Sequence, residues 1–429
     1  MRKTIYLIIT LCFPAIFQHL AAQTYTYTLE DCRQMAIEKN AQLQEMKIGE
    51  QISLQMKKQA LTYFFPNVSA FGMGFKASNS VISLDLGMLG SMALLKDGVM
   101  VSAMAVQPVF MGGKVFYSTK LADTGIRASE LFTALKKDEV LARTDEYFWL
   151  LYSLYEKRKT VAVMQQVLDS LYKDVQQAVN AGILGQNEVL KVTLQQHTLR
   201  TKNVELENGI FLANMALARQ MGLPVDSVDH FMIAPPGDLT VSDPIQYFLE
   251  PSQVLSLRTE YQLLEMGVRA AALEKKIETA SYMPQVGIGA FYYYENFLDK
   301  NNWNGGVMAA VRVPISDWAR GSYAIRQKKL EESKAQIRRE DGHQQLLMQI
   351  RQAWGKFVES YQKYLLAELT VEESRENARL NETYYRAGTV SLTELLAARG
   401  FLQESQDKRI DAIRDYQVAK SMYLQVTGR

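Results

Sequence analysis

Apolar side chains recur every three or four positions over two very long stretches of the chain. The first runs from about 114 to 180 without a proline, with Leu121, Ile126 and Leu131 among its apolar positions. The second runs from about 317 to 386. At 1.5 Å per residue, the first stretch predicts a helix roughly 100 Å long. One globular core cannot bury helices of this length, so we expect long antiparallel coiled-coil packing.

Shorter helical stretches flank each long one. They cover about 29–62 and 186–221 in the first half of the chain, and about 251–282 and 392–426 in the second. In each half the two shorter stretches together match the long one in length. They can therefore lie end to end along it, and the sequence predicts a mainly α fold.

Between the first short helix and the long one, the period of the pattern changes to two. Phe71, Met73 and Phe75 alternate with small residues in the first half, and Ile288 and Ala290 alternate with glycines in the second. A returning strand in each half brings the total to four β-strands per chain. Alternating strands of about ten residues with tyrosines near one end suit a membrane β-barrel, or else an amphipathic hairpin on a soluble core.

The two halves repeat one another at a nearly constant offset. The matching residues are Ala181-Gly182 and Ala387-Gly388, Glu188 and Glu394, Pro108 and Pro314, and, with a slightly different offset, Pro66 and Pro284. Such a repeat indicates two copies of one structural unit.

The first twenty-odd residues have the pattern of a secretory signal peptide. Arg2 and Lys3 precede an apolar stretch from Ile5 to Phe17, and small residues follow at a suitable cleavage site. No later run of eighteen apolar residues predicts a transmembrane helix. The predicted segments are a signal peptide over 1–23, a first structural repeat over 24–223, a linker or equatorial segment over 224–250 and a second structural repeat over 251–429.

Composition and motifs argue against catalysis and against a nucleic-acid partner. The formal net charge of +2 falls to about zero without Arg2 and Lys3. The four histidines are scattered, and the sequence contains no triad spacing, metal-ligand pair or nucleotide fingerprint. Cys32 is alone once Cys12 leaves with the signal peptide. We expect no enzyme activity, no cofactor and no bound metal.

Four strands are too few to span a membrane in a single chain. Lipid leaves no partner for an unpaired strand edge, so a spanning sheet must close, and known barrels begin at eight strands. Closure therefore requires several identical chains around a cyclic axis. Two copies would give eight strands and three would give twelve, and the strands alone do not choose between these numbers.

The order of elements, the duplication and several motifs resemble the TolC family of outer-membrane efflux and secretion channels. The motifs are Gln107-Pro108-Val109-Phe110-Met111-Gly112-Gly113, Val313-Pro314-Ile315-Ser316-Asp317-Trp318, Ala181-Gly182 with Asn187-Glu188, and Tyr385-Arg386-Ala387-Gly388 with Thr393-Glu394. The resemblance covers essentially the whole mature chain. It implies a homotrimer with a twelve-stranded barrel in outer-membrane lipid and a helical tunnel through the periplasm.

The resemblance also implies which residues carry the function. It assigns Ala181, Gly182, Glu188, Ala387, Gly388 and Thr389 to tips that dock a periplasmic membrane-fusion adaptor, and through it an inner-membrane pump or ABC exporter. It assigns Pro108, Gly112, Gly113, Pro314 and Trp318 to the strand–helix junctions. Glu394 falls where relatives narrow the tunnel with an acidic pair, but Ala397 holds the second position. Ser391-Leu392-Thr393-Glu394 also has the capping-box pattern, which would bind Glu394 to the helix start.

Two interpretations follow. The first is a passive outer-membrane conduit of a tripartite efflux pump or a type I secretion system, for small molecules or polypeptides. The second is a periplasmic structural coiled-coil protein without a membrane barrel. A structural rod has no need of four alternating strands at matching places, which favours the conduit. The apolar segment from about 77 to 100 either extends the strands outward or folds into the barrel mouth.

Overall fold

The structure is a computed structural model, and it describes residues 25–429 apart from 86, 88–90, 226–230, 237–238 and 298–300. The predicted signal peptide lies outside the described residues. The described chain is mainly helical and forms two compact units. The smaller unit comprises the described residues up to 38 together with 144–240, and the larger comprises 39–143 together with 241–429.

Long helices make up most of both units. The helices are α1 (Leu29–Lys39), α2 (Ala41–Thr62), α3 (Lys114–Asn180), α4 (Gln186–Gln220), α5 (Pro251–Leu255), α6 (Thr259–Ser281), α7 (Arg320–Arg386) and α8 (Leu392–Val426). The strands are β1 (Tyr25–Tyr27), β2 (Asn67–Lys76), β3 (Ile82–Asp85), β4 (Ser91–Leu95), β5 (Asp97–Met111), β6 (Phe231–Ile233), β7 (Gln285–Glu295) and β8 (Asn302–Arg312).

The element bounds reproduce the sequence repeat. Both α3 and α7 have 67 residues, and both α4 and α8 have 35. Helices α7 and α8 begin 206 residues after α3 and α4, whereas α6 and β7 begin 218 residues after α2 and β2. Corresponding residues can therefore be matched one to one by these two offsets.

The first short helix of each half is interrupted, so the prediction of continuous helices over 29–62 and 251–282 is wrong. Asn40 leaves helical geometry, and its side-chain oxygen accepts hydrogen bonds from the backbone N–H groups of Gln42 and Leu43 at 3.0 and 3.3 Å. Asparagine favours this capping position over a helix interior, so α1 ends and α2 begins here. A similar break separates α5 from α6.

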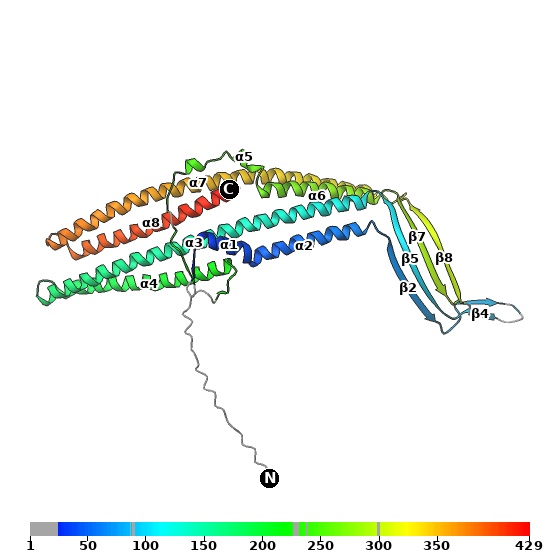
Figure 1. Cartoon of the computed structure of the whole chain (residues 1–429), viewed down its shortest axis with the longest axis horizontal. Helices are drawn as coiled ribbons and strands as arrows, with labels where there is room; N and C mark the ends of the chain where they lie inside the picture. The colour runs from blue at the N-terminus through cyan, green and yellow to red at the C-terminus, as the bar shows by residue number, and fades with distance from the viewer. Residues whose placement is uncertain (1–24, 86, 88–90, 226–230, 237–238, 298–300) are drawn as a thin grey trace, which may run out of the picture. The chain divides into compact units, whose positions relative to one another are not determined.

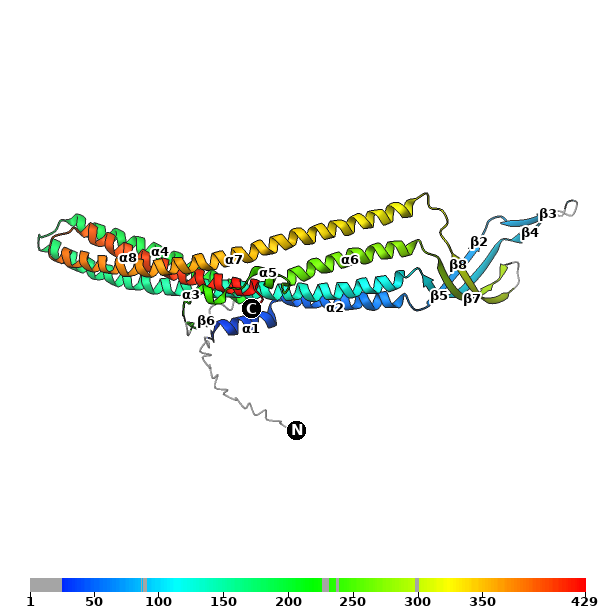
Figure 2. The ribbon, with the colours of Figure 1, turned by 90° about the horizontal axis from the view of Figure 1, so that it is seen from above.

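Four strands of the larger unit form one antiparallel sheet in the order β2-β5-β7-β8. Figure 1 shows this sheet beyond the ends of α2, α6 and α7. In Figure 2, α6 lies beside the first part of α7, and α8 lies beside its last part. The predicted end-to-end arrangement of short helices along a long one is thus observed in the second repeat.

Two small ribbons add to the four-stranded sheet. The sequence left open whether the first extends the strands outward or folds back, and it did not predict the second. Strands β3 and β4 form an antiparallel ribbon within the apolar segment 77–100, which extends beyond the four-stranded sheet (Figure 1). In the smaller unit, β1 pairs in parallel with β6. No helix in the described part of the chain combines the length and the apolarity needed to cross a membrane.

An aromatic layer holds α7 and α8 together and fastens the linker to them. Phe357, Tyr416 and Tyr423 are fully buried between the two helices. The hydroxyl oxygens of Tyr416 and Tyr423 accept hydrogen bonds from the backbone N–H groups of Ser242 and Leu249, each at 3.0 Å. The end of the predicted linker is therefore anchored to the helical hairpin by two phenols.

Candidate conduit wall and helical tips

The four-stranded sheet has one face that is apolar over most of its height. Residues paired directly across antiparallel strands lie on the same side, so the strand register assigns each side chain to a face. We define the apolar face by Val68, Ala70, Gly72, Gly74, Val99, Val101, Ala103, Ala105, Val286, Ile288, Ala290, Tyr292, Tyr294, Trp303, Gly305, Val307, Ala309 and Val311. Gln107 lies on this side at the end nearer the helices, and Lys76 and Asp97 lie on it at the opposite end.

Aromatic residues gather at one end of the apolar face. Trp303 lies against Tyr292 and Tyr294, with ring centroids 5.7 and 4.8 Å apart. Tyrosine and tryptophan suit a boundary between hydrocarbon and water, because each joins an apolar ring to a polar group. The strands β2, β7 and β8 have 10, 11 and 11 residues, which is the length that a tilted strand needs to cross a bilayer core.

The opposite face mixes polar and apolar side chains. We define this mixed face by Asn67, Ser69, Phe71, Met73, Phe75, Met100, Ser102, Met104, Val106, Gly289, Phe291, Tyr293, Glu295, Asn302, Asn304, Gly306, Met308, Ala310 and Arg312. It contains a hollow of about 400 Å³ whose lining includes Ser102, Tyr293 and Glu295 beside apolar side chains. A face of this composition can meet water, whereas the apolar face exposes hydrophobic groups over the whole width of the sheet.

Both outer strands of the sheet have an open edge. Among the described residues, β2 pairs only with β5 and β8 pairs only with β7. An unprotected edge of this length presents a row of free backbone donors and acceptors and is a template for another strand. The sheet is therefore incomplete as a single chain.

The predicted junction residues lie where the strands lead into the long helices. Pro108 lies beside a register shift in β5, where a residue without an N–H donor is tolerated. Gly112 and Gly113 precede α3 with φ of 62° and 85°. Pro314 follows β8, and Trp318 precedes α7 with a left-handed φ of 55° that the sequence did not predict.

The predicted tip residues lie in the two helical hairpins, one in each unit. Gly182 has φ of 72°, and the N–H of Ile183 donates to the carbonyl of Ala178 at 2.9 Å. Gly388 also has φ of 72°, and the N–H of Thr389 donates to the carbonyl of Tyr384 at 2.9 Å. Both turns use glycine because the left-handed conformation that closes such a helix end is unfavourable for other residues.

Side chains near the tips are held by short-range ion pairs. Glu188 does not cap α4, and instead it accepts a hydrogen bond from Lys191 at 2.8 Å. On the second hairpin, Glu382 of α7 pairs with Arg386 on the same helix and with Arg399 of α8. Ala181, Gly182, Ala387, Gly388 and Thr389 are all exposed, so the turns themselves are accessible to a partner.

The predicted capping box at Glu394 is confirmed. The backbone N–H of Ser391 donates to Oε2 of Glu394 at 2.7 Å, and the N–H of Glu394 donates to Oγ of Ser391 at 3.3 Å. The Ser391 hydroxyl also donates to Oε2 of Glu394, at 3.0 Å. The two hydrogen bonds to Oε2 lower the pKa of Glu394, with the backbone N–H of Ser391 as the main cause and its hydroxyl as the second. The bonds to the Glu394 carboxylate involve only one of its oxygens, Oε2. The predicted role of Glu394 in a tunnel constriction is not tested by this cap and stays a prediction.

We expect Glu394→Ala to loosen the start of α8 at neutral pH but not in acid. Because the folded-state pKa is lowered, the carboxylate stabilises the helix start above its unfolded pKa, and this contribution is lost as the pH falls through the folded pKa. Amide hydrogen exchange at Ser391, whose N–H the carboxylate binds, and at Leu395 in the first turn should therefore be faster in the variant at neutral pH and equal to wild type in acid. Equal exchange rates at neutral pH would contradict a stabilising cap.

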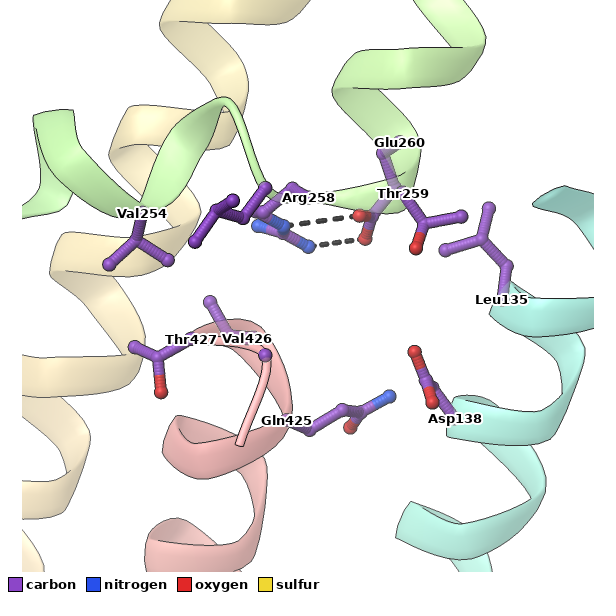
Figure 3. Close-up of a pocket in the computed structure, with 11 residues that line it drawn as sticks. Leu135, Asp138, Val254, Arg258, Thr259, Glu260, Gln425, Val426 and Thr427 are labelled. Carbon is purple, nitrogen blue, oxygen red and sulfur yellow. Dashed lines mark hydrogen bonds and ion pairs between the residues drawn. The ribbon is translucent and has the colours of Figure 1, made fainter.

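A small cavity lies where α5 and α6 meet the end of α8 and the side of α3 (Figure 3). Its volume is about 110 Å³. Arg258 is only 9% exposed, and it pairs with Glu260 and donates to Oε1 of Gln349 at 3.4 Å. Asp138 faces Glu260 across the cavity (Figure 3). Burial raises the pKa of Asp138, Lys137 partly opposes this, and Glu260 raises it further.

We expect Asp138→Asn to stabilise the protein at neutral pH. A carboxyl group whose folded pKa is raised destabilises the fold above that pKa, and this penalty disappears as the pH falls below the unfolded value. The thermal midpoint of the variant should exceed that of wild type near pH 7 and converge with it in acid. Glu139→Gln is the matched control, because Glu139 has a lowered pKa beside Lys136 and Arg143 and should instead lose stability. A lower midpoint for Asp138→Asn at pH 7 would contradict this interpretation.

Comparison with known proteins agrees with this architecture. Residues 251–429 match the protein family described as outer membrane efflux protein. No curated protein matches the chain in a sequence search.

Solved structures that resemble this fold include outer-membrane proteins and channels. The outer membrane protein VceC of Vibrio cholerae superposes with a TM-score of 0.79 at 16% identity, covering 93% of this chain and 96% of that chain. The CmeC channel of Campylobacter jejuni superposes with a TM-score of 0.80 at 14% identity, covering 93% of this chain and 85% of that chain. The MtrE channel of Neisseria gonorrhoeae superposes with a TM-score of 0.73 at 16% identity, covering 93% of this chain and 88% of that chain. The predicted resemblance is confirmed: the chain has the fold of the TolC-like outer-membrane channels, and its residues 251–429 match the outer membrane efflux protein family.

Proposed function

We propose that this chain is the outer-membrane channel component of a tripartite efflux pump or a type I secretion system. It acts as a passive conduit that exports small molecules or polypeptides. The observation that carries the proposal is the four-stranded sheet, with one apolar face, one mixed face and two open edges. The apolar face contacts lipid, the mixed face lines the conduit, and the open edges join neighbouring copies.

Closure of the sheet requires several identical copies, and the resemblance to the TolC family favours three. Lipid offers no hydrogen bonds to the open edges of β2 and β8, so both edges require partner strands. Three copies contribute twelve strands, an even number within the known range of membrane barrels. The fold that the chain shares with outer-membrane channels over 93% of its length supports placing this sheet in a barrel.

The helices extend this conduit through the periplasm, and the hairpin tips meet its partners. The exposed turns at Gly182 and Gly388 have the same left-handed glycine and the same closing hydrogen bond. In the trimer they form six docking points for a periplasmic membrane-fusion adaptor, which connects the channel to an inner-membrane pump or ABC exporter. The conduit needs no cofactor and performs no catalysis, because its function resides in the shape and lining of the passage.

The apolar face disfavours the rival function, a periplasmic structural coiled coil. Such a protein would place its sheet in water, where Val307, Val311 and Trp303, which are 89%, 67% and 62% exposed, would have no apolar environment. An apolar patch of this kind on a water-soluble protein marks an interaction surface or promotes aggregation. Lipid satisfies the whole face at once.

Conductance of the purified protein tests the proposal. Protein extracted from envelopes with detergent and added to a planar bilayer should give discrete, reproducible current steps. A protein that remains in the soluble periplasmic fraction and gives no current would contradict the channel and favour the structural coiled coil.

A further inference from the structure

The hollow on the mixed face is built from side chains of three adjacent strands. In the register of these strands, Phe71 of β2 lies opposite Ser102 of β5, and Ser102 lies opposite Tyr293 of β7. A small serine therefore separates two aromatic rings on one face of the sheet. The two outer strands are about 10 Å apart, and a flat ring stacked between two others needs about 7–8 Å. This row of residues thus forms a slot of suitable width for one flat ring.

Methionines close the slot in the direction of the strands. Met100 and Met104 lie two residues before and after Ser102 on the same face, and both line the hollow. A thioether side chain is flexible and packs well against aromatic groups. Met104 and Phe71 are 41% and 56% exposed, so a ligand can reach them. The volume of about 400 Å³ lies within the range of small-molecule sites.

Glu295 gives the hollow a negative charge. It lies opposite Met100 on the mixed face and lines the hollow. Its Oε1 accepts a hydrogen bond from Nδ2 of Asn302 at 3.2 Å, and no group among the described residues donates to Oε2. One carboxylate oxygen is therefore available to a ligand.

The only cationic side chain of the mixed face lies far from this carboxylate. Of the mixed-face residues, all of which the structure describes, Arg312 alone carries a positive charge, and it lies opposite Gln285. Gln285 and Glu295 are the two ends of β7, which has 11 residues. At about 3.4 Å per residue the two charges are about 34 Å apart, well beyond the Debye length of about 8 Å. Arg312 therefore does not neutralise Glu295.

We propose that this hollow binds flat aromatic organic cations, as one substrate class of the conduit. The site rests on the proposed function, because the mixed face lines a passage only if the sheet is part of a channel. Phe71 and Tyr293 supply ring faces that attract cations, and Glu295 attracts the same charge. The rings alone would also accept a flat anion, so the carboxylate provides the discrimination. In the trimer, three such sites line the passage toward the end away from the helices.

Calorimetric titration of the purified full-length channel in detergent tests the site. The probes are proflavine, a flat three-ring cation with N–H donors, and anthracenecarboxylate, a three-ring anion of similar outline. After subtraction of the titration into empty micelles, proflavine should bind saturably, with one molecule per chain, and the anion should not bind. Equal binding of the two probes, or binding that does not saturate, would mean partition into detergent and would overturn the proposal.

Glu295→Gln tests the recognition of charge with almost no change in shape. The Kd for proflavine should rise about tenfold or more, as expected when a hydrogen bond to a charged group is lost. Arg312→Gln is the matched control, because it removes the opposite charge from the far end of the same face and should leave the Kd within about twofold. An unchanged Kd in Glu295→Gln would overturn the proposal.

Ser102→Leu tests the slot without altering charge. The larger side chain fills the space between Phe71 and Tyr293 and should abolish proflavine binding, whereas Ala103→Leu on the apolar face should bind as wild type does. Retained binding in Ser102→Leu would overturn the slot. Either Ser102→Leu or Glu295→Gln tests the site if the other fails to assemble. Wild-type protein that conducts but does not bind proflavine would contradict this site alone, whereas wild-type protein that gives no current would contradict the proposed function.

Discussion

Lysine in place of Ala103 should remove the protein from the outer membrane, whereas lysine in place of the adjacent Ser102 should leave assembly intact. Ala103 lies on the apolar face of β5, directly opposite Ala70 and Tyr292. Ser102 lies on the mixed face beside the hollow that includes Tyr293. A lysine on the lipid side of a barrel costs about 2–4 kcal/mol at the bilayer midplane. Each copy in a trimer would carry this penalty.

The two variants differ in position by one residue and introduce the same side chain. Any general effect of the added lysine on synthesis or export is therefore the same in both variants. The measurement is the amount of protein in the outer-membrane fraction relative to wild type. If the Ser102→Lys protein were missing from the outer-membrane fraction and the Ala103→Lys protein were retained there, the lipid side and the conduit side would be the reverse of those assigned.

Valine in place of Gly182 and Gly388 should abolish adaptor-dependent efflux while leaving the trimer assembled. Both glycines have φ of 72°, and apart from each glycine and its chain neighbours no atom lies within 4 Å of the position where a Cβ would be. The effect therefore comes from the backbone, since a left-handed conformation costs an ordinary residue about 1–2 kcal/mol. Distorted turns would no longer present the same surface to the adaptor. Export should fall to the level of a strain without the channel.

Two controls separate backbone strain from bulk. Asparagine at the same two positions tolerates left-handed geometry and should retain much of the export. Gly400→Val places the same side chain in α8, where space is also open and no left-handed conformation is required. Unchanged export in the double valine variant, with the trimer intact, would contradict docking at the tips.

Much of the helical architecture could be predicted from local sequence. The bounds of α3 and α8 agree with the predicted stretches, because the turn at Gly182 ends α3 and the capping box of Ser391 begins α8. The break at Asn40 was missed because the apolar pattern continues across it. Asparagine at an N-cap outweighs that continuity by satisfying two backbone donors.

Features that depend on contacts between distant segments could not be predicted. Asp138 lies in a run of charged residues, which suggests a solvated helix face. In the structure it lines a cavity together with residues of α6 and α8, which come much later in the sequence. The left-handed pair at Trp318 and Ala319 was hidden because neither residue is a glycine. Its position opposite Gly112 and Gly113 in the repeat was the available signal.

The amphipathic strands indicated a barrel only in combination with the helices. Alternation alone fits a soluble hairpin equally well, because it fixes the two faces of a strand but not the solvent on each side. The strand register adds what the sequence lacked, since it aligns apolar residues of all four strands on one face.

Cell fractionation followed by native mass measurement tests the trimeric outer-membrane channel most directly. The protein should be recovered from the outer membrane only with detergent, and the purified species should have three times the mass of one mature chain. A soluble periplasmic monomer or dimer would mean that the open edges of β2 and β8 never close a barrel, and it would contradict the conduit.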